Sequence, residues 1–333
     1  MRNENLSRAE ASQLLDSLLD GSATDAQIAA TLIALKRKGE TVEELAGLAT
    51  GMRARSTQIN PRHERFIDTA GTGSSSAKTF NVSTAAAFVI AGAGLPVAKH
   101  GNRAASSRCG SADVLSSLGV NVSVDRSVSE TCLNEIGICF MFAPLYHGAT
   151  ARVAAIRREL GVHTTFNLLG PLTNPAGAPL QIVGVWNRDL LEPMAQTLAL
   201  LGTGRAWVVH GSDGLDEITI AGPTQVAEAR NGAVRTFEVA PDDFGFARGN
   251  LADLRCNDSV TSAVIIRSIL SGERRDDARN LVIANAAAAL TVAERAANLR
   301  EAANLAAQSI DEGAALGKLE DLIRYTSSTG AHG

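Results

Sequence analysis

The residues from Asp68 to Phe88, DTAGTGSSSAKTFNVSTAAAF, place glycine, serine and threonine directly before an alanine-rich apolar segment. That segment is typical of a helix, so the glycine-rich turn would lead into a helix N-terminus. Unpaired backbone N–H groups and the positive end of the helix dipole favour an anion at such a place. Taken alone, the turn is also compatible with a plain connection between a strand and a helix. We expect it to bind phosphate.

A second polar turn follows the next candidate strand, within VAKHGNRAASSRCGSADVL, Val97 to Leu115. It offers cations, amides and hydroxyls before another helix: Lys99, His100, Asn102, Arg103, Ser106 and Ser107. Ligands of open α/β sheets bind beyond the carboxyl ends of the strands. Two such turns after neighbouring strands suggest one ligand with phosphate groups at both ends. Lys99 could instead be a surface lysine at the end of a strand. His100 could be a hydrogen-bonded residue of the cleft that has no role in proton transfer.

A pair of carboxylates, Asp216 and Glu217, lies in the segment GSDGLDEITIAG, Gly211 to Gly222. Neighbouring side chains of an extended segment diverge, so these two would bracket a site. Carboxylate oxygens suit Mg²⁺, which usually keeps waters and bridges to phosphate. As an isolated dipeptide, Asp-Glu is more typical of a solvated turn.

Short apolar runs alternate with helical patterns from Phe66 onwards, which is typical of βαβ units around a mostly parallel sheet. We expect strands at Phe66–Thr69, Pro96–Lys99, Asn121–Val124, Ile138–Phe142, Gln181–Trp186 and Ala206–His210. Helices are expected to begin near Ser83, Ser111, Ser129, Gly148 and Asp189, and to fill the chain from about Thr261 to Tyr325. A later hairpin would turn on Asn231-Gly232, a dipeptide favoured in type I′ turns. His163 to Gly177 is the most loop-like interruption and a candidate hinge.

The first sixty residues predict three short helices, each opened by a capping box: Ser7-x-x-Glu10, Thr24-x-x-Gln27 and Thr41-x-x-Glu44. Each helix has an apolar stripe at helical spacing, and Gly21 and Gly39 supply stops. The surplus of apolar surface makes this unit a candidate dimer surface.

The composition excludes several classes of protein. A chain of 333 residues favours two domains or one large domain with an appended bundle. The formal net charge of −4 argues against a general nucleic-acid binder. No segment predicts a signal peptide or a membrane span, and the four cysteines show no metal-binding spacing. We therefore expect a cytoplasmic protein with reduced thiols and no membrane partner.

Four blocks of sequence, taken together, resemble the anthranilate phosphoribosyltransferases: TFNVSTAAAF, KHGNRAASS, RRELGVHTTFNLLGPLTNPAG and GLDEITIAG. They occur in that family's order and spacing, and the resemblance covers essentially the whole chain. It implies transfer of a phosphoribosyl group from phosphoribosyl pyrophosphate to the amine of anthranilate, in tryptophan biosynthesis. The implied fold is a small helical domain, residues 1–64 completed by helical segments near 163–178, hinged to an α/β domain, residues 65–333. A homodimer through the N-terminal helices is also implied.

The resemblance assigns site residues as well. Phosphoribosyl pyrophosphate would be bound by Gly71, Gly73, Ser74, Ser75, Thr79, Asn81, Val82, Ser83, Thr84, Lys99, His100, Gly101, Asn102, Arg103, Ala104, Ala105, Ser106, Ser107 and Ser111. Gly71, Asn102 and Arg157 would bind anthranilate, and Ser83, Asp216 and Glu217 would hold Mg²⁺. No residue is expected to act as a catalytic acid, base or nucleophile, because the neutral aromatic amine of anthranilate can attack directly once it is positioned.

The chain departs from the family's usual pattern at three places. Ser74, Ser75 and Ser76 stand where the family commonly continues with Gly-Asp-Gly, Tyr146 stands where histidine is frequent, and Cys109 where serine is frequent. These serines bear on the affinity for the donor and for magnesium. Two alternatives share the implied fold: a pyrimidine nucleoside phosphorylase, whose lysine-serine phosphate motif is missing here, and a non-catalytic nucleic-acid-binding relative.

Overall fold

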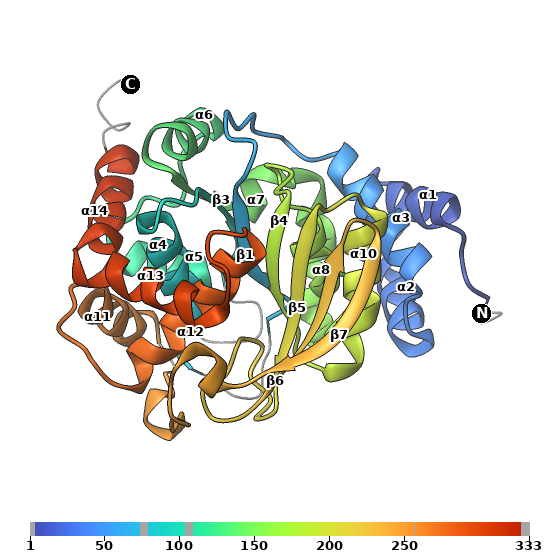
Figure 1. Ribbon diagram of the computed structural model, residues 1–333. Helices are drawn as coiled ribbons and strands as arrows, with labels where there is room; N and C mark the ends of the chain where they lie inside the picture. Colours follow the sequence, from blue (N-terminus) through green and yellow to red (C-terminus); the bar gives the residue numbers. More distant parts are fainter. Residues whose placement is uncertain (1–3, 74–78, 104–108, 257, 328–333) are drawn as a thin grey trace.

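The computed structural model describes residues 4–73, 79–103, 109–256 and 258–327. A seven-stranded sheet lies at the centre of the molecule and carries helices on both faces (Figure 1). Its strands are β1 (Ile67–Gly71), β2 (Val97–Gly101), β3 (Ile138–Phe142), β4 (Leu180–Gly184), β5 (Arg205–Gly211), β6 (Thr224–Arg230) and β7 (Ala233–Val239).

The strand order β3-β2-β1-β4-β5-β6-β7 places a topological switch point beside β1. Ile67 pairs in parallel with Val97 of β2 on one side and with Leu180 of β4 on the other. Strands β1 to β5 are parallel, whereas β6 and β7 are antiparallel additions at one edge. In such sheets the ligand crevice opens at the carboxyl ends of the strands that flank the switch point. The topology therefore points to the ends of β1, β2 and β4.

The N-terminal helices begin where their capping residues predict. They are α1 (Arg8–Leu19), α2 (Asp25–Lys38) and α3 (Val42–Ala54). Each of the three predicted capping boxes is present, with the hydroxyl of Ser7, Thr24 or Thr41 accepting a backbone N–H. Gly39 ends α2 at a φ of 81°, in the left-handed region that favours glycine.

The other helices cover the two faces of the sheet. They are α4 (Val82–Gly92), α5 (Ser111–Ser117), α6 (Arg126–Thr131), α7 (Ala143–Tyr146), α8 (Ala151–Leu160), α9 (Thr165–Leu172), α10 (Leu191–Leu200), α11 (Ser259–Leu270), α12 (Asp277–Val292), α13 (Leu299–Asp311) and α14 (Ala314–Ser327). Figure 1 shows α4 and α11 to α14 on one side of the sheet, and α8 and α10 with the N-terminal helices on the other. The expected α/β fold with a small N-terminal helical unit is confirmed.

Two apolar cores lie on opposite faces of the sheet. The first is formed largely by α4, α11, α12 and the inward side chains of β1, β2 and β3. The second joins the apolar stripes of α1 to α3 with α8, α9, α10 and the other face of the sheet, including Val183 and Val208. Arg53 of α3 donates from Nε to the carbonyl of Leu172 in α9 at 2.7 Å. The boundary at residue 64 stays a prediction, although the N-terminal helices share their core with α8 to α10.

Two expectations about local structure were wrong. The segment Asn121–Val124 forms a turn between α5 and α6 with no strand. Its valines alternate because Val122 and Val124 are both buried, Val122 within the first core. Asn121 donates from its backbone N–H to Thr326 of α14 at 3.2 Å. The stretch His163–Gly177, expected from its composition to be loop-like, contains α9, which opens with a capping box at Thr164. This helix agrees with the helical segments that the resemblance implies near 163–178. Its apolar side chains pack into the second core.

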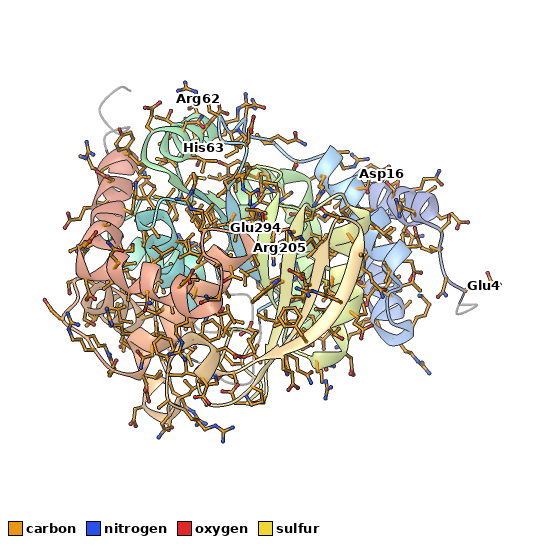
Figure 2. The ribbon with its side chains drawn as sticks, in the orientation of Figure 1. Glu4, Asp16, Arg62, His63, Arg205 and Glu294 are labelled. Atoms are coloured by element: carbon orange, nitrogen blue, oxygen red, sulfur yellow. The ribbon has the colours of Figure 1, made fainter. Side chains whose placement is uncertain are left out.

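The predicted hairpin is confirmed, with Asn231 at a φ of 51° and Gly232 at 79°, as a type I′ turn requires. Beneath it, at the amino end of β5, the buried Glu228 is paired with Arg205 at 2.7 Å and with Arg235 at 2.5 Å. Figure 2 shows Arg205 beside Glu294, 3.6 Å apart. Although burial alone would raise the pKa of Glu228, hydrogen bonds from Trp207, Arg235 and Arg205 lower it. This charged network stabilises the edge of the sheet opposite the carboxyl ends.

Candidate functional site

The carboxyl end of β4 is crossed at very short range by the segment that carries the two carboxylates. A Cβ atom on Gly184 would lie 1.7 Å from the backbone oxygen of Asp216, so only glycine fits there. On neighbouring β1, a Cβ on Gly71 would lie 3.6 Å from Oδ2 of Asp216 and 3.6 Å from the carbonyl of Gly184. The close approach of these backbones holds Asp216 at the switch point between β1 and β4.

Glu217 lies against the first turn of α4. Its Oε1 accepts the backbone N–H of Ser83 at 3.2 Å, so the acidic segment and the helix that follows the glycine-rich turn meet directly. Burial, and then the neighbouring Asp216, raise the pKa of Glu217 well above its usual range, against the opposing effects of Lys99 and Ser83. A positive charge placed next to this buried carboxyl group would stabilise its ionised form.

Lys99 of β2 is buried among oxygen atoms of this same region. Its Nζ donates to the carbonyl of Thr69, to Oγ1 of Thr69 at 3.2 Å and to Oγ of Ser83 at 3.4 Å. The side chain is 4% exposed, which excludes the surface-lysine alternative. Burial lowers the pKa of Lys99, while Asp68 and Glu217 raise it. These hydrogen bonds hold the amino group of Lys99 in a fixed position between β1, β2 and α4.

Asp68 of β1 ties this edge of the sheet to the segment after α9. Its carboxylate accepts the backbone N–H of His100 at 3.1 Å and Nδ2 of Asn174 at 2.7 Å. Asn174 also donates to the carbonyl of Ala98 at 2.9 Å. Burial raises the pKa of Asp68 to about 6, although Lys99 and these hydrogen bonds oppose the rise.

His100 faces away from Lys99 and packs against a second histidine. Its Nδ1 lies 3.2 Å from the carbonyl of Gly170 in α9, and its ring meets that of His147 edge-on at 5.1 Å. Burial, and then His147, lower the pKa of His100 to about 3, and burial lowers that of His147 to about 4. Both rings are therefore neutral at pH 7, and the expectation that His100 has no role in proton transfer stays a prediction.

The turn after β2 leads into α5. The backbone carbonyl of Asn102 accepts the backbone N–H of Ala112 at 3.2 Å and the hydroxyl of Ser111 at 3.4 Å. Arg103 pairs with Asp113 of α5 at 2.9 Å. A Cβ on Gly101 would lie 2.2 Å from Oγ of Ser111 and 2.8 Å from the ring of Phe140, so a larger residue would displace these side chains.

The expected acceptor residue Arg157 belongs to a different part of the structure. It lies on α8, where its Nη2 donates to Oδ1 of Asn167 at 3.1 Å and its guanidinium lies 5.5 Å from the ring centre of Phe166. Its Nε is buried and has no hydrogen-bond partner among the described residues. Burial lowers the pKa of Arg157, but a guanidinium remains charged at neutral pH. Asn167, on α9, therefore orients the guanidinium through Nη2, and a carboxylate ligand for Arg157 stays a prediction.

The sequence-based site is thus brought together in part. Gly71, Ser83, Lys99, Asp216 and Glu217 meet at the carboxyl edge of β1, β2 and β4 through the contacts given above. Arg157 makes its contacts with α9, and its link to Gly71 and Asn102 stays a prediction. Six of the expected donor-site residues lie outside the described part of the chain: Ser74, Ser75, Ala104, Ala105, Ser106 and Ser107.

Sequence reasoning missed Thr69, Asp68 and Asn174. Asp68 stands inside an otherwise buried strand, and a carboxylate in such a run is a signal that could have been noticed. Asn174 has no local signal, because its partner lies 106 residues away.

Comparisons with known proteins match both parts of the chain. A family model described as the a/b domain of a glycosyl transferase family matches residues 63–316, and the helical bundle domain of that family matches residues 1–56. The anthranilate phosphoribosyltransferase of Moorella thermoacetica is 51% identical over 328 residues, 98% of this chain and 96% of its own length. The chain belongs to the anthranilate phosphoribosyltransferase family.

Solved structures of anthranilate phosphoribosyltransferases superpose closely on this fold. The enzyme from Thermus thermophilus matches with a TM-score of 0.91 at 36% identity, over 98% of this chain and 97% of its own. The Saccharomyces cerevisiae enzyme, solved in complex with PRPP (phosphoribosyl pyrophosphate) and Mg, matches with a TM-score of 0.88 at 29% identity, over 97% and 94%. The family's small helical unit and α/β sheet are therefore both present here. In the described part of the chain, no helix is long and apolar enough to cross a membrane.

Proposed function

We propose that this chain transfers the phosphoribosyl group of PRPP to the amine of anthranilate, giving N-(5-phosphoribosyl)anthranilate and pyrophosphate in tryptophan biosynthesis. The observation that supports the proposal is the contact of Glu217 with the first turn of α4 beside Lys99, which places a carboxylate and an amino group together at the switch point. It occurs in a chain that is half identical to curated anthranilate phosphoribosyltransferases over almost its whole length.

Magnesium fits the residues at this site. Asp216 and Glu217 provide hard oxygen ligands, and the raised pKa of the buried Glu217 means that its ionised form needs a cation nearby. We infer that these two carboxylates and the hydroxyl of Ser83 hold the ion. Mg²⁺, when bound, neutralises charge on the pyrophosphate leaving group. The yeast relative in complex with PRPP and Mg supports this assignment.

The protein's own groups position the donor. As the bond from ribose C1 to pyrophosphate breaks, negative charge builds on the leaving group. The Gly71–Gly73 turn and the first turn of α4 are proposed to lie beside the pyrophosphate, because the N-terminus of a helix favours negative charge. Lys99 fixes Ser83 and Thr69 around the same place. Asn81, Thr79, Val82, Thr84, Gly101, Arg103 and Ser111 complete the donor site proposed here.

The acceptor is positioned by Arg157 together with Gly71 and Asn102. A guanidinium recognises a carboxylate through two parallel hydrogen bonds, and Asn167 and Phe166 already hold that of Arg157. The carboxylate of anthranilate would thereby aim the neighbouring neutral amine at ribose C1. Catalysis then rests on position and electrostatics, with no covalent intermediate on the protein.

The N-terminal helices are proposed to form a homodimer. Ile33 of α2 is 40% exposed, which leaves apolar surface on this unit. Sedimentation velocity of the chain and of Ile33→Asp tests the assignment, and a dimer that persists unchanged in the variant places the interface elsewhere. Residence in the cytoplasm stays a prediction.

A coupled assay tests the main proposal. Consumption of anthranilate is followed by the loss of its fluorescence in the presence of PRPP and Mg²⁺. Thermal shifts with PRPP, anthranilate, uridine and single-stranded DNA separate the alternatives. Stabilisation by uridine without product from anthranilate would indicate a nucleoside phosphorylase, and stabilisation by DNA alone a nucleic-acid-binding relative.

A further inference from the structure

We propose that Ser262, on α11, is a positioning residue that aims the carboxamide of Asn81 at the phosphoribosyl donor. The inference rests on the proposed function and adds a helix from the C-terminal third of the chain to the site. It is carried by a closed pair of hydrogen bonds between these two residues.

Asn81 is the N-cap residue of α4, yet its side chain does not cap the helix. Its backbone N–H donates to Oγ of Ser262 at 3.0 Å, and the hydroxyl of Ser262 donates back to Oδ1 of Asn81 at 3.1 Å. Ser262 is fully buried, and a buried hydroxyl requires such partners. Because the hydroxyl both accepts and donates within one residue pair, it fixes the rotamer of Asn81.

A second donor completes this arrangement. The thiol of Cys109 donates to the same Oδ1 of Asn81 at 3.1 Å. A carboxamide oxygen accepts two hydrogen bonds, so Ser262 and Cys109 together occupy it. The NH₂ group of Asn81 then remains as a donor, and it makes no hydrogen bond to any described residue. A carboxamide held in this way offers hydrogen bonds to an anion.

The position of Asn81 directs that donor to the site. Asn81 stands two residues before Ser83, whose backbone N–H contacts Glu217 at 3.2 Å and whose hydroxyl lies 3.4 Å from Nζ of Lys99. The first turn of α4, which begins directly after Asn81, therefore meets both groups at the crevice proposed for the donor's phosphates.

The beginning of α11 is held close to α4 by a further contact. Thr79 and Arg255 form an antiparallel bridge between the segment that precedes Asn81 and the segment that precedes α11. The backbone bridge and the Asn81–Ser262 pair both join the start of α4 to the start of α11. Ser262 is therefore placed by its surroundings to act on Asn81.

The test compares Ser262→Ala with the unaltered chain in steady-state kinetics. We expect the KM for PRPP to rise about fivefold, the size of one lost hydrogen bond, while kcat and the KM for anthranilate change less than about twofold. Ser268→Ala is the matched control, because Ser268 lies on the same helix and donates to the carbonyl of Ile265. An unchanged KM for PRPP in a Ser262→Ala protein with a normal melting temperature would overturn the proposal.

A double-mutant cycle with Asn81→Ala separates positioning from a merely structural role. If Ser262 acts through Asn81, Ser262→Ala has no further effect on the KM for PRPP in the Asn81→Ala background. An equal effect in both backgrounds overturns the proposal.

If Ser262→Ala fails to fold, variants of Cys109 test the orientation of Asn81 without a change in α11. Cys109→Ala is expected to raise the KM for PRPP, and Cys109→Ser to restore it, since a hydroxyl also donates to Oδ1 of Asn81. Equal KM values in Cys109→Ala, Cys109→Ser and the unaltered chain would overturn the proposal. In contrast, an unaltered chain that makes no product from PRPP and anthranilate contradicts the proposed function itself.

Discussion

Replacing Gly184 by alanine tests the geometry of the acidic segment most directly. The added Cβ would lie 1.7 Å from the backbone oxygen of Asp216, whereas ordinary contact begins at 3.4 Å. The two backbones must therefore separate by about 1.7 Å, because neither contacting atom belongs to a flexible side chain. Mg²⁺ requires ligand distances of about 2.0–2.1 Å in near-ideal octahedral geometry, so a displacement of this size removes Asp216 and Glu217 from their positions.

We expect Gly184→Ala to lose activity about a hundredfold, as a misplacement of about 1 Å does in other sites. Overpacking should also lower the free energy of unfolding by about 1–3 kcal/mol. Activity is measured across a magnesium titration, together with chemical unfolding. The matched control is Gly317→Ala on α14, where an added Cβ meets nothing within 4 Å. A Gly184→Ala protein with the unaltered kcat and magnesium dependence would refute this account of the crossing.

Three further predictions follow from the same contacts. Arg157→Ala should raise the KM for anthranilate about tenfold or more and leave that for PRPP nearly unchanged, because one charge-assisted carboxylate contact contributes about 1.5–3 kcal/mol; equal changes in both KM values would remove Arg157 from the acceptor site. Asp216→Asn combined with Glu217→Gln should abolish most turnover with an unaltered circular dichroism spectrum, and near-normal activity would argue against these magnesium ligands. The lowered pKa of His147, about 4, means that the unfolded chain binds a proton there at pH 5 and the folded chain does not. Stability therefore falls as the pH drops through about 6.5, by about 2 kcal/mol at pH 5. His147→Phe should lose correspondingly less stability between pH 7 and pH 5 in urea unfolding, and an equal loss in both proteins would contradict this prediction.

Local signals predicted the parts of the fold that depend on neighbouring residues. The capping boxes at Ser7, Thr24 and Thr41 fixed the starts of three helices, because a cap and its N3 partner lie within one turn. Asn231-Gly232 predicted its turn for the same reason. Alternating burial misled at Asn121–Val124, since a loop that packs its valines inward has the same pattern as a strand with no partner.

Only those residues of the candidate site that stand in short sequence motifs could be predicted from the sequence. Lys99, Asp216 and Glu217 stand in stretches whose composition indicates anion and metal binding. In contrast, Asp68 and Ser262 act through partners 106 and 181 residues distant, Asn174 and Asn81, and no spacing in the sequence indicates such pairs. The segment after α9 brings Asn174 against β1 and β2, and the packing of α11 on α4 brings Ser262 to Asn81.

The second core has a consequence for how the chain folds as it is synthesised. The apolar stripes of α1 to α3 are complete once Met52 has been made, but the residues that cover them begin with Val153 of α8 and continue to Leu198 of α10. At about 5–20 residues per second, the roughly 100 to 150 residues between Met52 and these partners take about 5–30 s to synthesise. During that interval their apolar faces are open to chaperones or to the same helices of a neighbouring nascent chain.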